Sequence, residues 1–158
     1  MTIVYLALGT NVGDSTTNLD AAVTLLQEKI TNLTEAPRYI SKAVGYTDQP
    51  DFVNSAVRGE TDLQPLELLS FVKNIEQQVG RIARFRWGPR EIDIDIIFYG
   101  DHIIHEPTLD IPHPRFMERD FVLLPLCSLS PDLVDPLSNL TVSELYEKIP
   151  VDERSIQA

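Results

Sequence analysis

The chain of 158 residues contains little cysteine and little histidine. Its one cysteine, Cys127, excludes a disulfide within the chain and any metal site built from several thiolates. Cys127 ends an apolar run that begins at Phe121, so we interpret it as a small hydrophobic residue rather than as a nucleophile. The three histidines do not follow the spacing of zinc ligands, which argues against a zinc site.

Long hydrophobic runs are also missing. No apolar stretch is long enough to span a bilayer, and residues Met1–Tyr5 carry neither a basic leader nor a cleavage signal. We therefore expect a cytoplasmic protein with no membrane partner. With 43% hydrophobic residues the chain can bury a core of its own, and we expect one domain that spans residues 1–158.

Positive charge is scarce, because 13 Lys and Arg residues stand against 24 Asp and Glu residues, a formal net charge of −11. This balance argues against a nucleic-acid partner. Four arginines nevertheless crowd one ten-residue window, at positions 81, 84, 86 and 90. On an acidic protein such a local cationic cluster favours a small bound anion. The phosphate-binding pattern Gly-x-x-x-x-Gly-Lys-[Ser/Thr] is absent, so a triphosphate would have to be held in another way.

The segment after this window alternates in character. Ile92, Ile94 and Ile96 are separated by Asp93 and Asp95, and this period of two with β-branched residues is typical of a strand. Residues two apart share a strand face, so the two carboxylates should lie about 7 Å apart, side by side. Such a pair suits magnesium, which binds through one or two carboxylates together with substrate phosphates. Arginines suit the phosphates because a guanidinium binds oxyanions through two parallel hydrogen bonds.

A simpler interpretation of the same pattern is a polar strand face beside a solvated basic loop. For an isolated Asp-x-Asp that interpretation would be preferred. Here the pair follows directly after Trp87, Gly88, Pro89 and Arg90, and this combination favours a phosphate and magnesium site.

The periodicities predict an ordered series of elements. They are a strand over 2–8, a helix capped by Asp14 or Ser15, a poorer strand over 33–44, a strand over 52–61, a helix from Gln64 that stops at Gly80, and the Asp strand. This order predicts an α+β fold with a ferredoxin-like βαββαβ core, in which helices pack on an antiparallel sheet. The C-terminal additions are a buried helix or strand over 121–129, a short helix over 142–149, and a frayed polar tail after Pro150.

The segment 86–97 and four further segments carry a family resemblance. The segment 86–97 reads Arg-Trp-Gly-Pro-Arg-Glu-Ile-Asp-Ile-Asp-Ile-Ile and resembles the signature of the 6-hydroxymethyl-7,8-dihydropterin pyrophosphokinases of the folate pathway. Similar motifs of that family match residues 9–11, 44–54, 111–115 and 118–126. The motifs occur in the family's order and cover nearly the whole chain.

The resemblance implies a reaction and its site. A pyrophosphoryl group would pass from ATP to the hydroxymethyl oxygen of 6-hydroxymethyl-7,8-dihydropterin, giving AMP and the pterin diphosphate in tetrahydrofolate biosynthesis. Implied catalytic residues are Arg81, Arg90, Asp93 and Asp95, of which Asp93 and Asp95 would bind two Mg²⁺ ions per ATP. Implied ATP-binding residues are Glu76, Arg84, Trp87, Arg90, Ile96, His113 and Arg119. Implied pterin-binding residues are Ser41, Val44, Gly45, Phe52, Asn54, Asp93 and Phe121, with the ring stacked between the two phenylalanines.

The chain departs from the family pattern at Ala43, where many members have proline, and at Lys73, where some have glutamine. Two other functions remain open on the residues alone. A non-catalytic metabolite sensor would bind ATP without producing AMP, and a metal-dependent nuclease would use the Asp pair on a phosphodiester. For the oligomeric state we expect a monomer or a weak homodimer.

Overall fold

The structure is a computed structural model that describes residues 1–11, 14–42, 51–83 and 92–156, without the side chains of residues 81–83. Its elements in chain order are β1 (Thr2–Thr10), α1 (Ser15–Leu26), β2 (Thr31–Glu35), β3 (Tyr39–Ser41), β4 (Phe52–Thr61), α2 (Pro65–Ala83), β5 (Asp93–Tyr99), β6 (Ile104–Glu106), β7 (Leu109–Ile111), the 3₁₀ turn η1 (Phe116–Glu118), α3 (Asp120–Leu129), α4 (Val142–Glu147) and the 3₁₀ turn η2 (Val151–Glu153).

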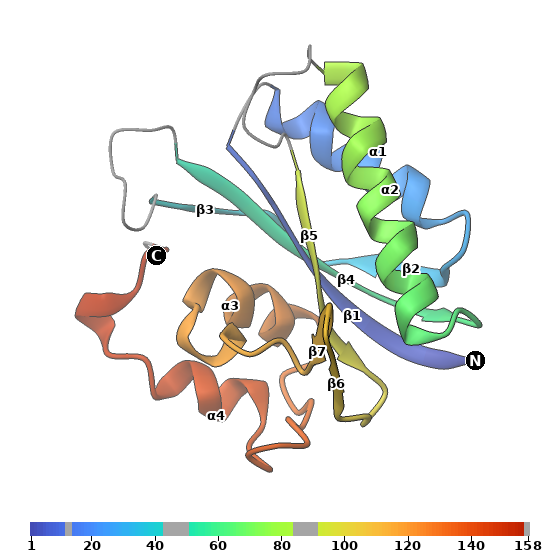
Figure 1. The fold of residues 1–158 in the computed structure, drawn as a ribbon. Helices are drawn as coiled ribbons and strands as arrows, with labels where there is room; N and C mark the ends of the chain where they lie inside the picture. Colours follow the sequence, from blue (N-terminus) through green and yellow to red (C-terminus); the bar gives the residue numbers. More distant parts are fainter. Residues whose placement is uncertain (12–13, 43–50, 84–91, 157–158) are drawn as a thin grey trace.

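The main sheet is antiparallel and follows the order β2-β4-β1-β5, with β3 also paired to β4. Strand β1 lies at its centre, between β4 and β5 and antiparallel to both. Helices α1 and α2 cover one face of this sheet, and α3 and α4 cover the other (Figure 1). The predicted α+β fold with its ferredoxin-like core and C-terminal additions is therefore confirmed.

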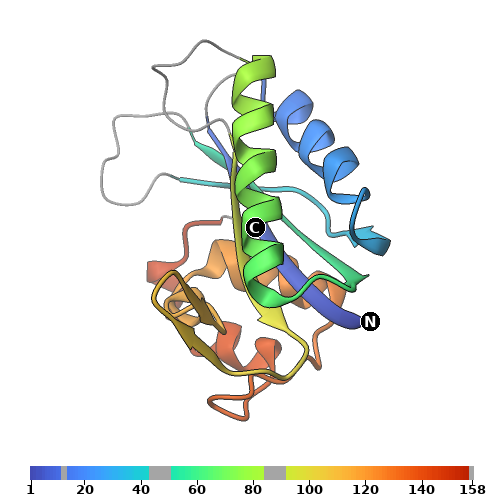
Figure 2. The ribbon, with the colours of Figure 1, turned by 45° about the vertical axis from the view of Figure 1, so that its right-hand side comes forward.

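Two apolar cores form because successive side chains of a strand point to opposite faces. On β1, Leu6 and Leu8 pack into the core beneath α1 and α2, whereas Tyr5 and Ala7 pack into the core beneath α3 and α4. We call these the α1/α2 core and the α3/α4 core. Both layers share the strands of a single sheet (Figure 2).

Helix α1 begins as its sequence predicts. The side chain of Asp14 accepts a hydrogen bond from the backbone N–H of Thr17 at 3.2 Å, which satisfies one of the unpaired donors at the helix start. Apolar residues at helical spacing are buried at Leu19, Ala22 and Leu26. Ile30, which continues this spacing, lies beyond the helix end and is also fully buried.

The prediction of one strand over 33–44 is wrong, because β2 and β3 are separate strands. Pro37 lies between them, and proline has no N–H to donate to a strand ladder. The preceding residue, Ala36, still donates its N–H to the carbonyl of Ala56 at 2.8 Å. Both strands pair with β4, so the chain remains along the same strand edge through the break.

Three other expectations at element ends are settled by the structure. Helix α2 does not stop at Gly80 but continues to Ala83. The segment 121–129, left open as helix or strand, is helical although it contains Pro125. The described part of the tail after Pro150 is not frayed, since residues 151–153 form η2 and Ser155 and Ile156 are hydrogen-bonded to Asp120 of α3.

Cys127 is half-buried against the α3/α4 core, and burial raises the pKa of its thiol. A raised pKa favours the uncharged thiol, which agrees with its interpretation as a small hydrophobic residue. Within the described ranges, no helix combines the length and the apolarity needed to cross a membrane.

Candidate active site

Strand β5 presents its two carboxylates on the face opposite its buried isoleucines. Ile94 and Ile96 lie in the α1/α2 core, whereas Asp93 is exposed and Asp95 half-exposed. Asp95 stands opposite Ala7 of β1, and Ala7 faces the α3/α4 side. The alternation predicted from the sequence is confirmed, and both carboxylates face the side of α3.

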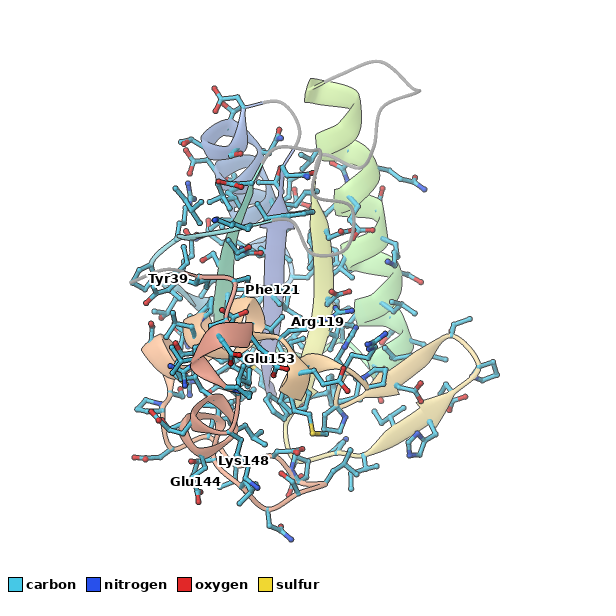
Figure 3. The ribbon with its side chains drawn as sticks, turned by 90° about the vertical axis from the view of Figure 1, so that its left-hand side faces the viewer. Tyr39, Arg119, Phe121, Glu144, Lys148 and Glu153 are labelled. Atoms are coloured by element: carbon cyan, nitrogen blue, oxygen red, sulfur yellow. The ribbon has the colours of Figure 1, made fainter. Side chains whose placement is uncertain are left out.

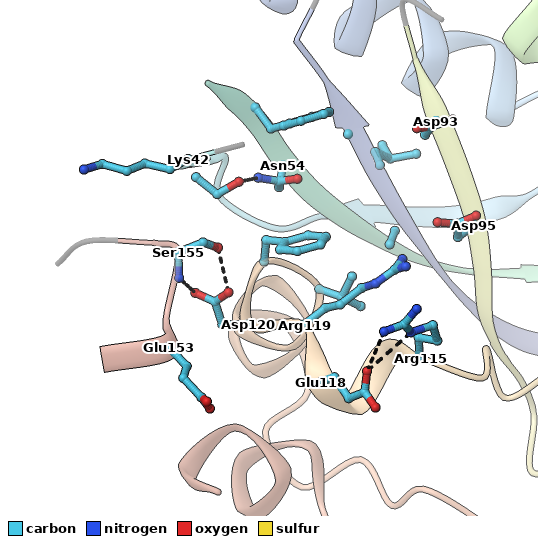
Figure 4. Close-up of a pocket in the computed structure, with 17 residues that line it drawn as sticks. Lys42, Asn54, Asp93, Asp95, Arg115, Glu118, Arg119, Asp120, Glu153 and Ser155 are labelled. Carbon is cyan, nitrogen blue, oxygen red and sulfur yellow. Dashed lines mark hydrogen bonds and ion pairs between the residues drawn. The ribbon is translucent and has the colours of Figure 1, made fainter. Parts of the chain in front are cut away.

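A cleft of about 490 Å³ opens on this face, between the sheet and the start of α3 (Figure 4). It brings together seven of the residues implied by the resemblance, namely Ser41, Phe52, Asn54, Asp93, Asp95, Arg119 and Phe121. They come from β3, β4, β5 and the segment 119–121, which are far apart in the sequence. A site of this composition can bind an aromatic ring at one end and a charged group at the other.

The floor of the cleft is a row across three strands. Asn54 of β4 pairs with Gly9 of β1, and Gly9 pairs with Asp93 of β5. A side chain at position 9 would bring a Cβ to 3.3 Å from Oδ1 of Asn54. Glycine therefore keeps open the space between an amide on one side and a carboxylate on the other.

The amide of Asn54 is buried and oriented. Its Nδ2 donates a hydrogen bond of 2.7 Å to Oγ of Ser41, and the two residues are only 4% and 2% exposed. This bond uses one of its two N–H groups, and a side-chain amide also has a second N–H and a carbonyl oxygen, which can pair with the edge of a heterocycle. The predicted role of Asn54 in reading a flat ring is compatible with this geometry.

The aromatic and cationic walls of the cleft come from two elements. Phe52 begins β4, and Phe121 lies in the first turn of α3, where both rings are half-buried. The guanidinium carbon of Arg119 lies 5.8 Å from the centre of the Phe121 ring, and the side chain extends towards Asp95 (Figure 4). Figure 3 shows Arg119 and Phe121 side by side on this face of the sheet. A planar ring and a polyanion could thus be held next to each other.

His113 is not among the residues that line the cleft, but it is electrostatically linked to it. The backbone N–H of His113 donates to the carbonyl of Ile97 on β5. The ring Nδ1 of His113 accepts from the backbone N–H of Arg115. Burial lowers the pKa of His113, the charge of Asp95 works against this, and the charge of Arg119 adds to the lowering. The lowered pKa favours the neutral imidazole at neutral pH.

Two residues that the resemblance places near ATP lie elsewhere. Ile96 is buried in the α1/α2 core, behind the sheet as seen from the cleft. Glu76 of α2 is also buried on that side, where it accepts the backbone N–H of Ile94 at 2.8 Å and forms an ion pair of 3.3 Å with Lys73. Neither residue lines the described cleft, and their contact with adenine stays a prediction.

Several implied residues fall outside the part of the chain that the structure describes. These are Val44, Gly45, Arg84, Trp87, Arg90 and the side chain of Arg81. Their roles stay predictions from the resemblance.

The cleft also contains residues that the sequence did not single out. Lys42 and Arg115 add positive charge, but Arg115 forms an ion pair of 3.2 Å with Glu118, and Glu118 and Glu153 add negative charge to the same lining. Asp120 and Ser155 complete the wall next to Phe121. Asp120 stands at the unspecified position of the motif Glu-Arg-x-Phe at 118–121, and the sequence around Ser155 is merely polar, so neither residue carried a signal of its own.

The donor set fits magnesium bound together with a nucleotide. No group of three or more His, Cys, Asp or Glu side chains that could enclose a metal ion occurs among the described residues. Mg²⁺ does not need such a cage, because it commonly uses one or two carboxylates, waters and substrate phosphates. Asp93 and Asp95, on one strand face and open to the cleft, offer that set of ligands.

Comparison with known proteins shows the chain's relatives. The family described as 7,8-dihydro-6-hydroxymethylpterin-pyrophosphokinase matches residues 5–131. A relative from Aquifex aeolicus, named 2-amino-4-hydroxy-6-hydroxymethyldihydropteridine pyrophosphokinase, is 41% identical over 144 residues, which cover 91% of this chain and 90% of that protein.

Other relatives are much longer. The folic acid synthesis protein FOL1 of Dictyostelium discoideum is 42% identical over 148 residues, and the match covers 94% of this chain but only 22% of that protein. The crystal structure of wild-type HPPK-DHPS from Plasmodium falciparum with pterin and p-hydroxybenzoate matches with a TM-score of 0.74 and 19% identity, covering 93% of this chain and 41% of that chain. At that identity the likeness supports the fold alone.

Proposed function

The chain belongs to the 7,8-dihydro-6-hydroxymethylpterin-pyrophosphokinase family, and we propose that it transfers a pyrophosphoryl group from ATP to 6-hydroxymethyl-7,8-dihydropterin. The products are AMP and the pterin diphosphate, an intermediate of tetrahydrofolate biosynthesis. The family, its similarly named relatives and the composition of the cleft support this proposal together.

The pterin occupies the end of the cleft between β4 and α3. Its bicyclic ring stacks between Phe52 and Phe121, and Asn54 pairs with its donor and acceptor edge. The hydrogen bond from Asn54 to Ser41 fixes the rotation of the amide before the ligand arrives. Pre-orientation of this kind reduces the entropy lost on binding.

The triphosphate occupies the end of the cleft beside β5. Asp93 and Asp95 would hold the magnesium ions, two per ATP, which would neutralise phosphate charge and orient the transferring group. Arg119 contributes positive charge from the position directly before α3, and Lys42 and Arg115 lie on the rim of the same cleft. Arg81, Arg84 and Arg90 would add further positive charge from the segment that precedes β5.

The reaction is an in-line displacement at the β-phosphorus of ATP. A bond forms between the hydroxymethyl oxygen and the β-phosphorus, the bond from that phosphorus to the oxygen of the α-phosphate breaks, and AMP leaves with the bonding electron pair. The hydroxyl proton passes to solvent. Such transfers depend on positioning and charge neutralisation rather than on covalent catalysis, and the residues of this cleft are suited to both tasks.

The observation that carries the proposal is the row Asn54, Gly9 and Asp93 across β4, β1 and β5. It places an oriented amide and a carboxylate on either side of a residue without a side chain. A ring that pairs with Asn54 therefore lies next to the carboxylate that would hold magnesium at the phosphates, as a transfer between the two ligands requires.

The test measures AMP formation from ATP, Mg²⁺ and 6-hydroxymethyl-7,8-dihydropterin by coupled assay, with each component omitted in turn. We expect AMP only when all three are present. Binding of ATP without AMP production would support a metabolite sensor instead. Binding of an oligonucleotide at low salt, followed by its cleavage, would support the nuclease alternative.

A further inference from the structure

The wall of the cleft next to α3 includes a segment that is distant in sequence. Residues 150–156, which we call the strap, follow α4 and form η2. They then run past the first residue of α3 to the end of β3 (Figure 1). Glu153 and Ser155 of the strap line the cleft. Nothing in the proposed reaction assigns this segment a task.

One end of the strap is anchored on α4. The guanidinium carbon of Arg154 lies 4.4 Å from the centre of the Tyr146 ring. The same guanidinium donates hydrogen bonds to the carbonyls of Ile149 and Tyr146 at 3.2 and 3.4 Å. This contact holds the strap at Arg154, directly before Ser155, and Ser155 and Ile156 are positioned by other contacts.

That far end is held by Asp120. Its Oδ1 accepts from Oγ of Ser155 at 2.7 Å, and its Oδ2 accepts from the backbone N–H groups of Ser155 and Ile156 at 2.8 and 2.9 Å (Figure 4). Asp120 is only 3% exposed. A carboxylate so deeply buried is tolerated when hydrogen bonds replace its lost water, so the strap and Asp120 depend on each other.

From there the strap continues to the residues that read the pterin. Ile156 forms an antiparallel bridge with Ser41, and the N–H of Lys42 donates to the carbonyl of Ser155 at 3.3 Å. Ser41 is the hydrogen-bond partner of Asn54. A continuous series of contacts thus leads from Asp120 to the amide of Asn54.

Asp120 also directly precedes Phe121, which forms the opposite aromatic wall. It therefore ties the helix that carries Phe121 to the strand end that carries Ser41. A second tie, from Oη of Tyr39 to Oγ of Ser128 at 2.6 Å, joins the other end of β3 to α3. Without the strap, β3 would keep its pairing with β4, in which Ser41 stands opposite Phe52, and its tie to α3 at Tyr39. Only the tie from Ser41 to α3 would be lost, so any loosening would be local to the pterin end of the cleft.

We propose that Asp120 is a positioning residue for the pterin, acting through the strap to hold Ser41 and Asn54 in place. This inference rests on the proposed function, because that function makes this end of the cleft the pterin end. The residue does not touch the ring. Its removal should weaken pterin binding and leave nucleotide binding at β5 intact.

The chain offers a matched control for this proposal. Asp135 is fully buried and also accepts three hydrogen bonds, from the backbone N–H groups of Leu137 and Ser138 and from Oγ of Ser138. It lies in the connection between α3 and α4 and does not line the cleft. Asp135→Asn should therefore lower the free energy of unfolding as Asp120→Asn does, but it should leave the pterin Kd unchanged.

Calorimetry should measure the dissociation constants of 6-hydroxymethyl-7,8-dihydropterin and of a non-hydrolysable ATP analogue with Mg²⁺ for the unchanged protein and for D120N, S155A and D135N. We expect D120N to raise the pterin Kd about tenfold, as expected when hydrogen bonds to a charged group are lost. S155A removes only one of the three hydrogen bonds to Asp120, so it should raise the pterin Kd less than D120N does. It also provides the test of the proposal if D120N does not fold. The nucleotide Kd should change by less than about twofold in all variants.

Amide hydrogen exchange at Lys42 gives a second readout that needs no ligand. We expect faster exchange in D120N and S155A and unchanged exchange in D135N. An unchanged pterin Kd in D120N and S155A, or an equal rise in D135N, would overturn the proposal. Failure of the unchanged protein to bind the pterin would overturn the proposed function instead, and the exchange at Lys42 would still decide whether Asp120 positions Ser41.

Discussion

Asp95 is half-exposed on β5, across from Ala7, and its side chain is not part of either core. Asp95→Asn keeps the shape of the side chain and removes the charge that would bind magnesium. We expect AMP formation to fall about a hundredfold or more, because a ligand that would hold magnesium at the reacting phosphates is lost. The rate of AMP formation at saturating Mg²⁺, with a magnesium titration by calorimetry, checks this.

The control for Asp95 is Asp101, which is exposed in the turn that follows β5. Asp101→Asn removes the same charge at the other end of the strand. The rate of AMP formation should stay within about twofold of that of the unchanged protein, because surface substitutions away from a site usually have small effects. Both variants should unfold at nearly the unchanged temperature. A D95N protein with AMP formation within tenfold of the unchanged protein would contradict a magnesium site at this carboxylate.

At the residue scale, the sequence predicted the features that depend on local periodicity. The alternation of Ile94 and Ile96 with Asp93 and Asp95 fixed which side chains face the cleft, because a strand has a period of two. Asp120 could not be found in this way. Its partners Ser155 and Ile156 lie more than thirty positions along the chain, and no local pattern contains a pairing over such a distance.

At the scale of single elements, the largest error concerned the edge of the sheet. The predicted strand over 33–44 ignored Pro37, which ends β2 and separates it from β3. The strap was missed for a different reason. Polar residues normally favour a frayed terminus, but here the buried carboxylate of Asp120 replaces water as their partner.

Strand β4 contains a glycine, Gly59, whose neighbours leave no room for a side chain. At Gly59 an added Cβ would lie 2.3 Å from Cγ2 of Ile30, 3.1 Å from the carbonyl of Thr31 and 3.2 Å from Cδ1 of Leu33. Ile30 is fully buried and cannot move away freely. We expect Gly59→Ala to lower the free energy of unfolding by about 1–3 kcal/mol through overpacking, measured as a lower urea midpoint with an unchanged slope.

The cause of that loss can be separated from a general effect on the strand. In an Ile30→Ala background the most crowded atom is gone, so Gly59→Ala should cost less than it does alone. A double-mutant cycle on the four proteins measures the difference. Equal costs in both backgrounds would show that the clash with Ile30 is not the source of the instability.

At the scale of the whole molecule, the charge of the described cleft follows the net balance of the chain. The formal net charge is −11, and five acidic residues line the described cleft against the three basic residues Lys42, Arg115 and Arg119. An acidic lining repels a bare polyanion and favours a phosphate that arrives bound to a cation. A nucleotide would therefore have to enter together with magnesium, and the arginine window that the sequence indicated lies outside the described side chains.

The two cores share one sheet, which decides how the molecule should unfold. Strand β1 places Leu6 and Leu8 in the α1/α2 core and Tyr5 and Ala7 in the α3/α4 core. Loss of either helical layer would expose one whole apolar face of that sheet to water, so neither layer is expected to persist without the other. The prediction of one domain over residues 1–158 therefore becomes a prediction of one cooperative transition.

Calorimetry should accordingly give a ratio of calorimetric to van 't Hoff enthalpy of about one, the criterion for two-state unfolding. Amide protons of α1 and of α3 should exchange with the same limiting free energy, since both then depend on global opening. We predicted a monomer or a weak homodimer, and a midpoint that does not change with protein concentration would favour the monomer, because a dimer is stabilised by mass action. Two separated transitions, with α3 and α4 lost first, would contradict this prediction. The layer that carries the pterin end of the cleft would then unfold independently, and the coupling that Asp120 provides would act within that layer alone.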